Sequence, residues 1–179
     1  MLTGWGKFMS EKTIQESISS ISNVMLPSQA NAAGNVHGGE IMKLMDTAAS
    51  VAAMKHCRSN VVTLRVDELI FHQPIYVGEL VTVNSKVGFV GRTSMEIQVE
   101  VCVETMTQKD SPRLAQTAFF TFVALNEEGK SAPVPRLLLT TPEEKKAFAE
   151  GEERYLLYKK RPKNKVKEGA SCGFFSCKK

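Results

Sequence analysis

A polar, glycine-rich segment that runs directly into an apolar one is the part of the chain best suited to chemistry. Residues 31–39 read Asn-Ala-Ala-Gly-Asn-Val-His-Gly-Gly, and the apolar segment that follows carries Asp46. Gly38 and Gly39 have no side chain to hold off a ligand, and the first N–H groups of a helix that begins there have no intrahelical partner. Asp46 lies about two helical turns further on, among methionines and alanines, where a carboxylate should be partly desolvated. Donors that can polarise a carbonyl, together with a nearby base, favour acyl transfer.

The other candidate residues indicate neither a metal site nor a serine nucleophile. His37, within the glycine-rich segment, is either a base or a group that orders the loop. His56 and His72 have no complementary ligand at metal-binding spacing, and we read both as structural or surface residues. The motifs His-Glu-x-x-His and Gly-x-Ser-x-Gly do not occur. We therefore expect no metal and no α/β-hydrolase nucleophile.

Length and composition indicate one globular domain. With 179 residues and 42% hydrophobic content, the chain is long enough to bury one core, and it resembles neither a disordered nor a collagen-like protein. We expect a single domain over residues 1–161, with its core in 11–160, and a flexible basic tail over 162–179. The formal net charge is +4, and Lys and Arg are concentrated in the segment 159–179. Since no aromatic-interleaved basic motif accompanies them, we expect no nucleic-acid partner.

The chain has no run of about 20 apolar residues, so we expect no membrane span and a cytoplasmic protein. Cys57 and Cys102 fall in an expected helix and strand, where they should pack rather than form a bridge. Cys172 and Cys177 could pair, bind a metal or accept a lipid. Because stable disulfides are rare in the cytoplasm, we favour an inert tail.

The spacing of apolar residues predicts one long buried helix and an antiparallel sheet. From Gly39 to about Cys57, small or apolar residues occupy most of the circumference of a helix. The turns between the expected strands are too short for helical crossovers, which favours an antiparallel meander. Thr141-Pro142-Glu143-Glu144 predicts the start of a second helix that reaches about Lys160. The expected strands are one within 11–26 and four over 61–71, 79–90, 92–105 and 113–125.

The strand over 92–105 has the clearest pattern. Apolar residues from Met95 to Val103 alternate with polar ones from Glu96 to Glu104. Successive side chains of a strand point to opposite faces, so this strand should have one dry face and one wet face.

Four stretches resemble the acyl-CoA thioesterases of the cytosolic (brain) acyl-CoA hydrolase type. They are residues 33–39, 42–46, 92–96 and 118–123, and the likeness extends over about residues 20–161. The resemblance implies an α+β hotdog fold, in which an antiparallel sheet wraps around one long central helix, here with an additional C-terminal helix. Eukaryotic members carry two hotdog domains in tandem. This chain resembles the single-domain form, which implies that it self-associates.

The resemblance also implies a site shared between two copies. Asp46 of one subunit would face Asn31 of its partner, giving a homodimer with two equivalent sites and, as a trimer of such dimers, a hexamer. Asp46 would act as general base on a water or as the attacking nucleophile, Asn31 would orient the water, and the Gly39 N–H would stabilise the oxyanion. From spacing alone, Asp46 could equally belong to a polar stripe of the helix with Lys43 and Ser50.

Coenzyme A is expected as part of substrate and product, and no separate cofactor is expected. The resemblance places the turn of Arg92, Thr93 and Ser94 near the nucleotide. An ordinary hairpin turn with solvated charges would have the same sequence pattern. Lys159, Lys160 and Arg161 could reach a phosphate. Gly38, His37 and Asn35 complete the expected substrate contacts, and Met42, Met45 and Met54 are expected along the acyl chain.

The expected function is hydrolysis of fatty acyl-CoA to free fatty acid and CoA. One alternative is an enoyl-CoA hydratase-type hotdog enzyme, which would require a paired Asp and His in one active site. Another is a non-catalytic acyl-CoA-binding hotdog protein, which would keep the fold and the ligand without turnover.

Overall fold

The computed structural model describes residues 11–107 and 112–161; the expected tail over 162–179, with Cys172 and Cys177, lies outside them. None of the helices described is long and apolar enough to cross a membrane. The elements, in chain order, are β1 (Lys12–Thr13), the 3-10 helix η1 (Ile14–Ser17), β2 (Ser19–Val24), the 3-10 helix η2 (Pro27–Gln29), α1 (Gly38–Cys57), β3 (Asn60–Phe71), β4 (Leu80–Val90), β5 (Ser94–Glu104), β6 (Arg113–Leu125), β7 (Leu137–Leu138) and α2 (Pro142–Lys160).

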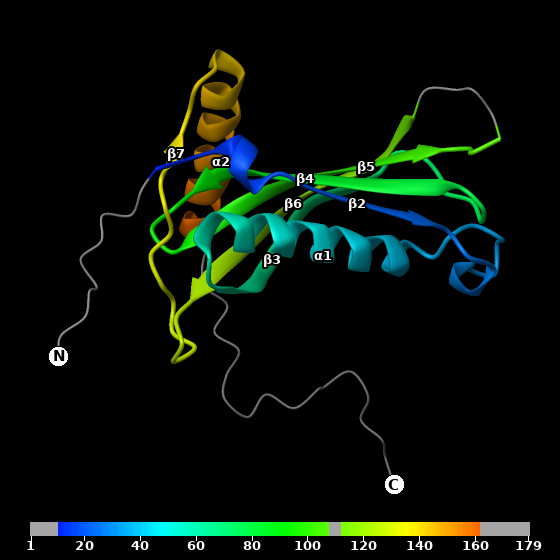
Figure 1. Cartoon of the computed structure of the whole chain (residues 1–179), viewed down its shortest axis with the longest axis horizontal. Coiled ribbons are helices and arrows are strands. Elements are labelled where there is room, and N and C mark those ends of the chain that lie inside the picture. The colour runs from blue at the N-terminus through cyan, green and yellow to red at the C-terminus, as the bar shows by residue number, and fades with distance from the viewer. Residues whose placement is uncertain (1–10, 108–111, 162–179) are drawn as a thin grey trace, which may run out of the picture.

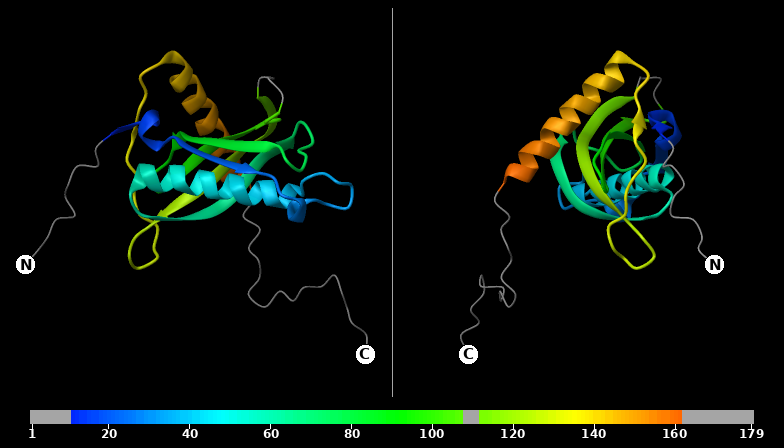
Figure 2. Two further views of the ribbon diagram at one scale, coloured as in Figure 1. Left: turned by 45° about the vertical axis from the view of Figure 1, so that its right-hand side comes forward. Right: turned by 90° about the vertical axis from the view of Figure 1, so that its left-hand side faces the viewer.

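Five strands form one antiparallel sheet in the order β2-β4-β5-β6-β3. α1 lies along the inner face of the curved sheet and α2 crosses its outer face (Figure 1, Figure 2). This is the hotdog arrangement that the sequence predicted, and the expected helices and main strands agree with the observed bounds to within a few residues. Of the segment 11–26, only β2 joins the main sheet, and β1 instead forms a separate parallel pair with β7.

The predicted meander is wrong for one strand. β4, β5 and β6 follow one another across the sheet, but β3 lies at the far edge beside β6. The reason is the place of α1 on the inner face of the curved sheet, where it contacts both β2 and β3, so the chain comes from one edge of the sheet and leaves for the other. Both edge strands, β2 and β3, therefore come from the part of the chain before the β4–β6 meander.

α1 packs on the sheet through small side chains. Ala48, Ala49, Ala52 and Ala53 are all fully buried, and their methyl groups allow the helix axis to lie close to the strands. The helix begins at an N-cap, His37, and ends at a residue in the left-handed conformation, as a helix C-terminus often does.

α2 covers the face of β5 that the sequence predicted to be wet. Glu96 is only 4% exposed because Arg154 of α2 pairs with it, with 2.7 Å between Nη2 and Oε1. The same guanidinium lies 3.8 Å from the ring centroid of Phe119. Gly151 allows this approach, since a Cβ there would lie 2.6 Å from Cβ of Phe89. A polar strand position can thus be buried when a later helix supplies its counter-ion.

His56 occupies the last turn of α1 and is fully buried, with its Nε2 2.9 Å from the carbonyl oxygen of Pro135. Burial lowers the pKa of His56 below its ordinary value of 6.5, because desolvation disfavours the charged ring. The unfolded chain therefore binds a proton at a higher pH than the folded chain does. The contribution of His56 to the free energy of unfolding is therefore fully present above pH 6.5. It is lost as the pH falls from 6.5 towards the lowered pKa of the folded state.

We expect the free energy of unfolding to fall by up to about 1.4 kcal/mol for each pH unit below 6.5. Urea unfolding between pH 8 and pH 5 measures this slope. His56→Gln keeps an N–H donor for Pro135 but cannot be protonated, so it should flatten the curve, whereas His72→Gln, at an exposed histidine, should not. An equal slope in all three proteins would contradict the assignment.

Candidate functional site

β3 changes the direction of its side chains at Leu64. Thr63 pairs with Phe122 and Arg65 pairs with Thr121, so Leu64 is an extra residue in the strand, a β-bulge. Without the bulge, Thr63 and Arg65 would point to the same face of the sheet. The bulge places Thr63 on the inner face, beside α1, and Arg65 on the outer face, with its guanidinium against α2.

Thr63 holds the carboxylate that the sequence singled out. Its Oγ1 donates a hydrogen bond of 2.7 Å to Oδ1 of Asp46. Asp46 is half-buried and Thr63 is exposed, so the carboxylate is held by one neighbour and open on another side. A hydrogen bond to an ionised acceptor contributes about 1.5–3 kcal/mol, enough to favour one rotamer strongly. Thr63 was not among the predicted site residues, because nothing in the pattern of the strand marks the bulge that directs its side chain towards Asp46.

Asn31 lies in the loop before α1, where it organises the backbone. Its Oδ1 accepts hydrogen bonds from the N–H of Ala33 (2.9 Å) and of Asn35 (3.2 Å). The backbone N–H of Asn31 donates to the Asn35 carbonyl oxygen, at 2.7 Å, which closes the loop. Asn35 also bridges to Tyr76, so the loop is tied to the segment after β3.

His37 orders the start of α1. Its Nδ1 accepts a 3.0 Å hydrogen bond from the N–H of Gly39, the donor that was expected to face an oxyanion. Of the two roles left open for His37, the structure shows the loop-ordering one. The Gly39 N–H therefore serves the helix cap here, and it becomes free for a substrate oxygen only when the imidazole turns away. Its role at an oxyanion stays a prediction.

Asp46 and the start of α1 lie on the same helix. Asp46 comes seven positions after Gly39, which corresponds to about 10 Å along a helix. Side chains of a helix lean towards its N-terminus, so the carboxylate lies closer to Gly39 than its own Cα does. A water and a carbonyl group can fill the remaining distance between the carboxylate and the Gly39 N–H.

The structure separates Arg92 from its two neighbours in the expected nucleotide-binding turn. Thr93 and Ser94 line a cavity of about 660 Å³ between the outer face of the sheet and α2. Arg92 instead lines a cavity of about 620 Å³ with Arg136, on the other side of the turn. A ligand that used all three residues would have to cross the turn.

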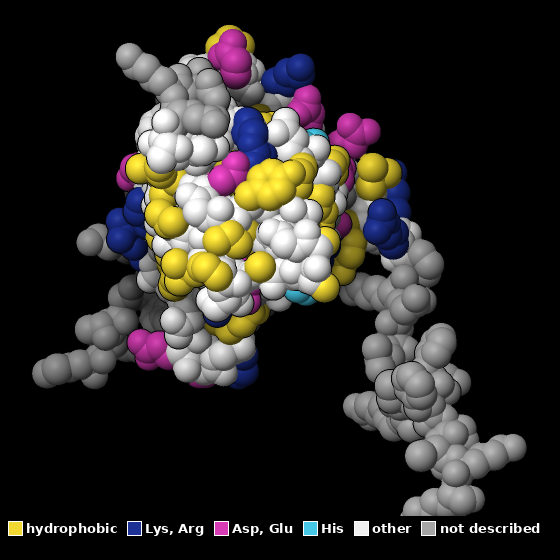
Figure 3. Space-filling model, turned by 90° about the vertical axis from the view of Figure 1, so that its right-hand side faces the viewer, with side chains coloured by type: hydrophobic (Ala, Val, Ile, Leu, Met, Phe, Trp, Pro, Cys, Tyr) yellow, Lys and Arg dark blue, Asp and Glu magenta, His cyan; other side chains and the backbone are white. Residues whose placement is uncertain are grey.

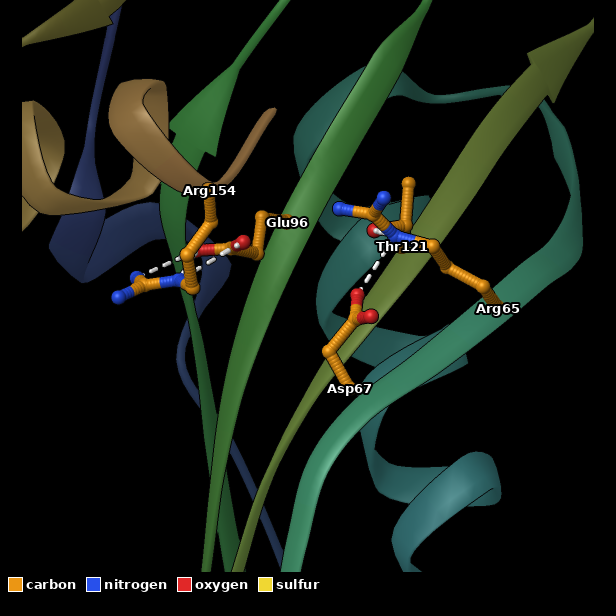
Figure 4. Close-up of polar contacts among 5 residues, drawn as sticks. All are labelled: Arg65, Asp67, Glu96, Thr121 and Arg154. Atoms are coloured by element: carbon orange, nitrogen blue, oxygen red, sulfur yellow. Dashed lines mark hydrogen bonds and ion pairs between the residues drawn. The ribbon is translucent and has the colours of Figure 1, made fainter. Parts of the chain in front are cut away.

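The larger cavity is rich in cations and aromatic rings. Arg65 is paired with Asp67 and donates to Oγ1 of Thr121 at 3.2 Å (Figure 4). Its guanidinium also lies 3.8 Å from the ring centroid of Tyr158. Lys159 and Arg161, two of the three cations expected to reach a phosphate, also line this cavity. Lys160 lines a separate surface depression on α2.

The three methionines expected along the acyl chain differ in exposure. Met42 and Met54 are 36% and 40% exposed on α1, whereas Met45 is fully buried in the core. The path of the acyl chain along α1 stays a prediction.

Exposed apolar side chains also mark the edge of the sheet and the end where α1 begins. On the edge strand β3, Val62, Leu64 and Val66 are 46%, 52% and 36% exposed. At the start of α1, hydrophobic side chains gather on the surface (Figure 3), and Phe71 and Tyr76 are about half exposed. An open strand edge with apolar side chains is suited to pairing with another strand.

A family model described as the thioesterase superfamily matches residues 33–109. The cytosolic acyl coenzyme A thioester hydrolase of Rattus norvegicus is 43% identical over 148 residues, which are 82% of this chain and 39% of that protein. The chain thus spans about two fifths of the length of this mammalian relative. An uncharacterized acyl-CoA thioester hydrolase of Bacillus subtilis is 39% identical over 120 residues, which are 67% of this chain and 69% of that protein.

Solved structures agree with these relatives. An apo-hexameric acyl-CoA thioesterase superposes with a TM-score of 0.80 at 32% identity, covering 85% of this chain and 97% of its own. The acyl-CoA hydrolase of Staphylococcus aureus, in complex with butyryl coenzyme A, coenzyme A and coenzyme A disulfide, gives a TM-score of 0.77 at 30% identity, with 83% and 90% covered. Structures of three variants of that enzyme have also been solved, in which one aspartate, one asparagine or one threonine is replaced by alanine. By sequence and by fold, the chain belongs to the acyl-CoA thioester hydrolases of the thioesterase superfamily.

Proposed function

We propose that this protein hydrolyses fatty acyl-CoA to a free fatty acid and CoA, with Asp46 as the catalytic carboxylate. The observation that carries the proposal is the hydrogen bond from Thr63 to Asp46, which holds a carboxylate on α1 with one side open. A thioester needs little more than an activated water and a stabilised oxyanion, because a thiolate is a good leaving group.

The spacing of the altered residues in the Staphylococcus aureus enzyme supports this assignment. Its replaced asparagine, aspartate and threonine follow one another along the chain in that order. Asn31, Asp46 and Thr63 have the same order and the same two spacings here. This match of order and spacing supports the assignment of the three residues as one set, including the threonine that the sequence pattern did not reveal.

In the proposed reaction, Asp46 removes a proton from a water as that water attacks the thioester carbonyl carbon. Thr63 keeps the carboxylate oriented, and the side-chain amide of Asn31 positions the water. The Gly39 N–H, once released by His37, stabilises the oxyanion at the start of α1. Direct attack by Asp46 on the carbonyl is the variant mechanism, and it needs the same orientation of the carboxylate.

Replacing Asp46 or Thr63 should reduce turnover to different extents. Asp46→Asn removes the base and should lower kcat at least about 100-fold. Thr63→Val removes only the orienting hydroxyl, so we expect a loss of about tenfold, and Thr63→Ser should restore most of it. Release of free thiol from acyl-CoA measures the rates.

The matched control for Thr63 is Thr82→Val, because the Thr82 hydroxyl also contacts a side chain, Ser22 Oγ, at 2.9 Å. It should keep wild-type turnover. Circular dichroism melting should show that all the variants remain folded. A folded Asp46→Asn protein with wild-type kcat would refute the mechanism.

The proposed assembly is a homodimer in which each site takes Asn31 from one subunit and Asp46 from the other, and a hexamer would be a trimer of such dimers. The open, apolar edge of β3 and the solved hexameric acyl-CoA thioesterases support it.

Mixing two inactive variants tests the shared site. Co-expressed Asn31→Ala and Asp46→Asn chains should form mixed dimers with one intact site each, so activity should return to about a quarter of wild type at random pairing. Asp46→Asn mixed with Thr63→Val should not exceed Thr63→Val alone, because both changes fall on the same side of the site. Recovery in neither mixture would indicate that each chain holds a complete site.

We further propose that the cavity under α2 holds the phosphate-bearing end of CoA. Its lining combines the hydroxyls of Thr93 and Ser94 with the cations Arg65, Lys159 and Arg161. The opposite charges of the phosphates and these side chains should attract, and salt should weaken that attraction.

Removing Lys159 and Arg161 together should raise KM for acyl-CoA about tenfold and reduce its dependence on salt. KM for the same acyl group on N-acetylcysteamine, which has no phosphate, should not change. Lys145→Ala with Lys146→Ala makes the same charge change at the other end of α2 and serves as the control. Equal changes in KM for both substrates would contradict a phosphate site here.

A further inference from the structure

Phe71, the last residue of β3, is in contact with the first residue of α1. A Cβ built on Gly38 would lie 2.9 Å from Cε1 of Phe71 and 3.3 Å from its Cζ. The aromatic ring therefore occupies the space where any other residue at position 38 would place its side chain. Phe71 is nevertheless 54% exposed, so the contact leaves much of the ring uncovered.

The surface beside the ring leads along α1 to the catalytic carboxylate. Gly38, Met42 and Asp46 follow one another at intervals of four, so they lie on one side of the helix. Met42 is 36% exposed. An apolar surface formed by the ring and the Met42 side chain thus borders the start of α1, where the thioester carbonyl is expected.

We propose that Phe71 is a specificity-determining residue whose ring packs against the first carbons of the acyl chain. The inference rests on the proposed thioesterase function, because that function places the carbonyl at the start of α1. A straight chain can lie flat against an aromatic ring, whereas a methyl branch on the carbon next to the carbonyl collides with it. The enzyme should therefore prefer straight acyl groups to those branched at this carbon.

The test compares butyryl-CoA with isobutyryl-CoA, which have the same number of carbons. Phe71→Ala should reduce the preference in kcat/KM for the straight substrate about tenfold, since one methyl group can be discriminated by that much. Gly38→Ala should also reduce this preference, because its methyl group displaces the ring from the start of α1, where the thioester carbonyl is expected.

The double variant Gly38→Ala with Phe71→Ala decides whether the two effects share one contact. Without the ring, the added methyl meets no obstacle, so the double variant should behave like Phe71→Ala alone. If the effects of the single changes on the substrate preference multiply instead, the ring does not transmit the effect and the proposal fails.

Ile70→Ala is the matched control. Ile70 is 48% exposed and its side chain points to the opposite face of the same strand, so the preference should not change. Size-exclusion chromatography with light scattering should give the wild-type mass for Phe71→Ala. A dissociated Phe71→Ala protein would show that the ring is a subunit contact and would overturn the proposal.

The wild-type enzyme separates this inference from the function on which it rests. If the wild-type protein hydrolyses no straight-chain acyl-CoA from butyryl to palmitoyl, the proposed function itself fails. If it hydrolyses only longer chains, the same comparison is made between a straight acyl group of that length and its isomer with a methyl branch next to the carbonyl. If it hydrolyses them and Phe71→Ala keeps the wild-type preference, only the role of Phe71 fails.

Discussion

The site depends on one extra residue in an edge strand. Leu64 interrupts the alternation of β3, and for that reason Thr63 meets Asp46 on the inner face while Arg65 contacts Tyr158 of α2 on the outer face. A regular strand would place both side chains on one face, and either the carboxylate or the cation-lined cavity would lose its partner. The bulge therefore links the two faces of the sheet, and it does so next to the edge where a second subunit would pair.

The position of the proposed site on α1 is the second constraint. Asp46 lies two turns after the glycine-rich start of the helix, and its carboxylate leans back towards that start. In the proposed assembly, Asn31 comes from a second copy, and the symmetry that completes one site completes the other as well. Assembly would then supply a catalytic group and also cover the apolar edge of β3.

Periodicity predicted the elements well, because α1, α2 and the four long strands each carry a strong local pattern. It could not predict where the strands lie, since the position of β3 beside β6 follows from the packing of α1 on the inner face between the two edge strands. It also misjudged Glu96, because the alternation of β5 shows two faces but does not show that Arg154, far along the chain, covers one of them. Of the site, Asp46 and the glycine-rich loop were found from local chemistry. Thr63 was not, because a bulge depends on the pairing of two strands and has no signature in one of them.

The two faces of the sheet divide the proposed substrate by its chemistry. On the inner face, the surface from Phe71 along Met42 to Asp46 is apolar up to the carboxylate, which suits an acyl chain and its carbonyl. On the outer face, Arg65, Lys159 and Arg161 surround a cavity suited to phosphates. Pairing of β3 with a second subunit would close the edge of the sheet between these two surfaces. A CoA thioester that uses both must therefore pass an end of the strands rather than the β3 edge.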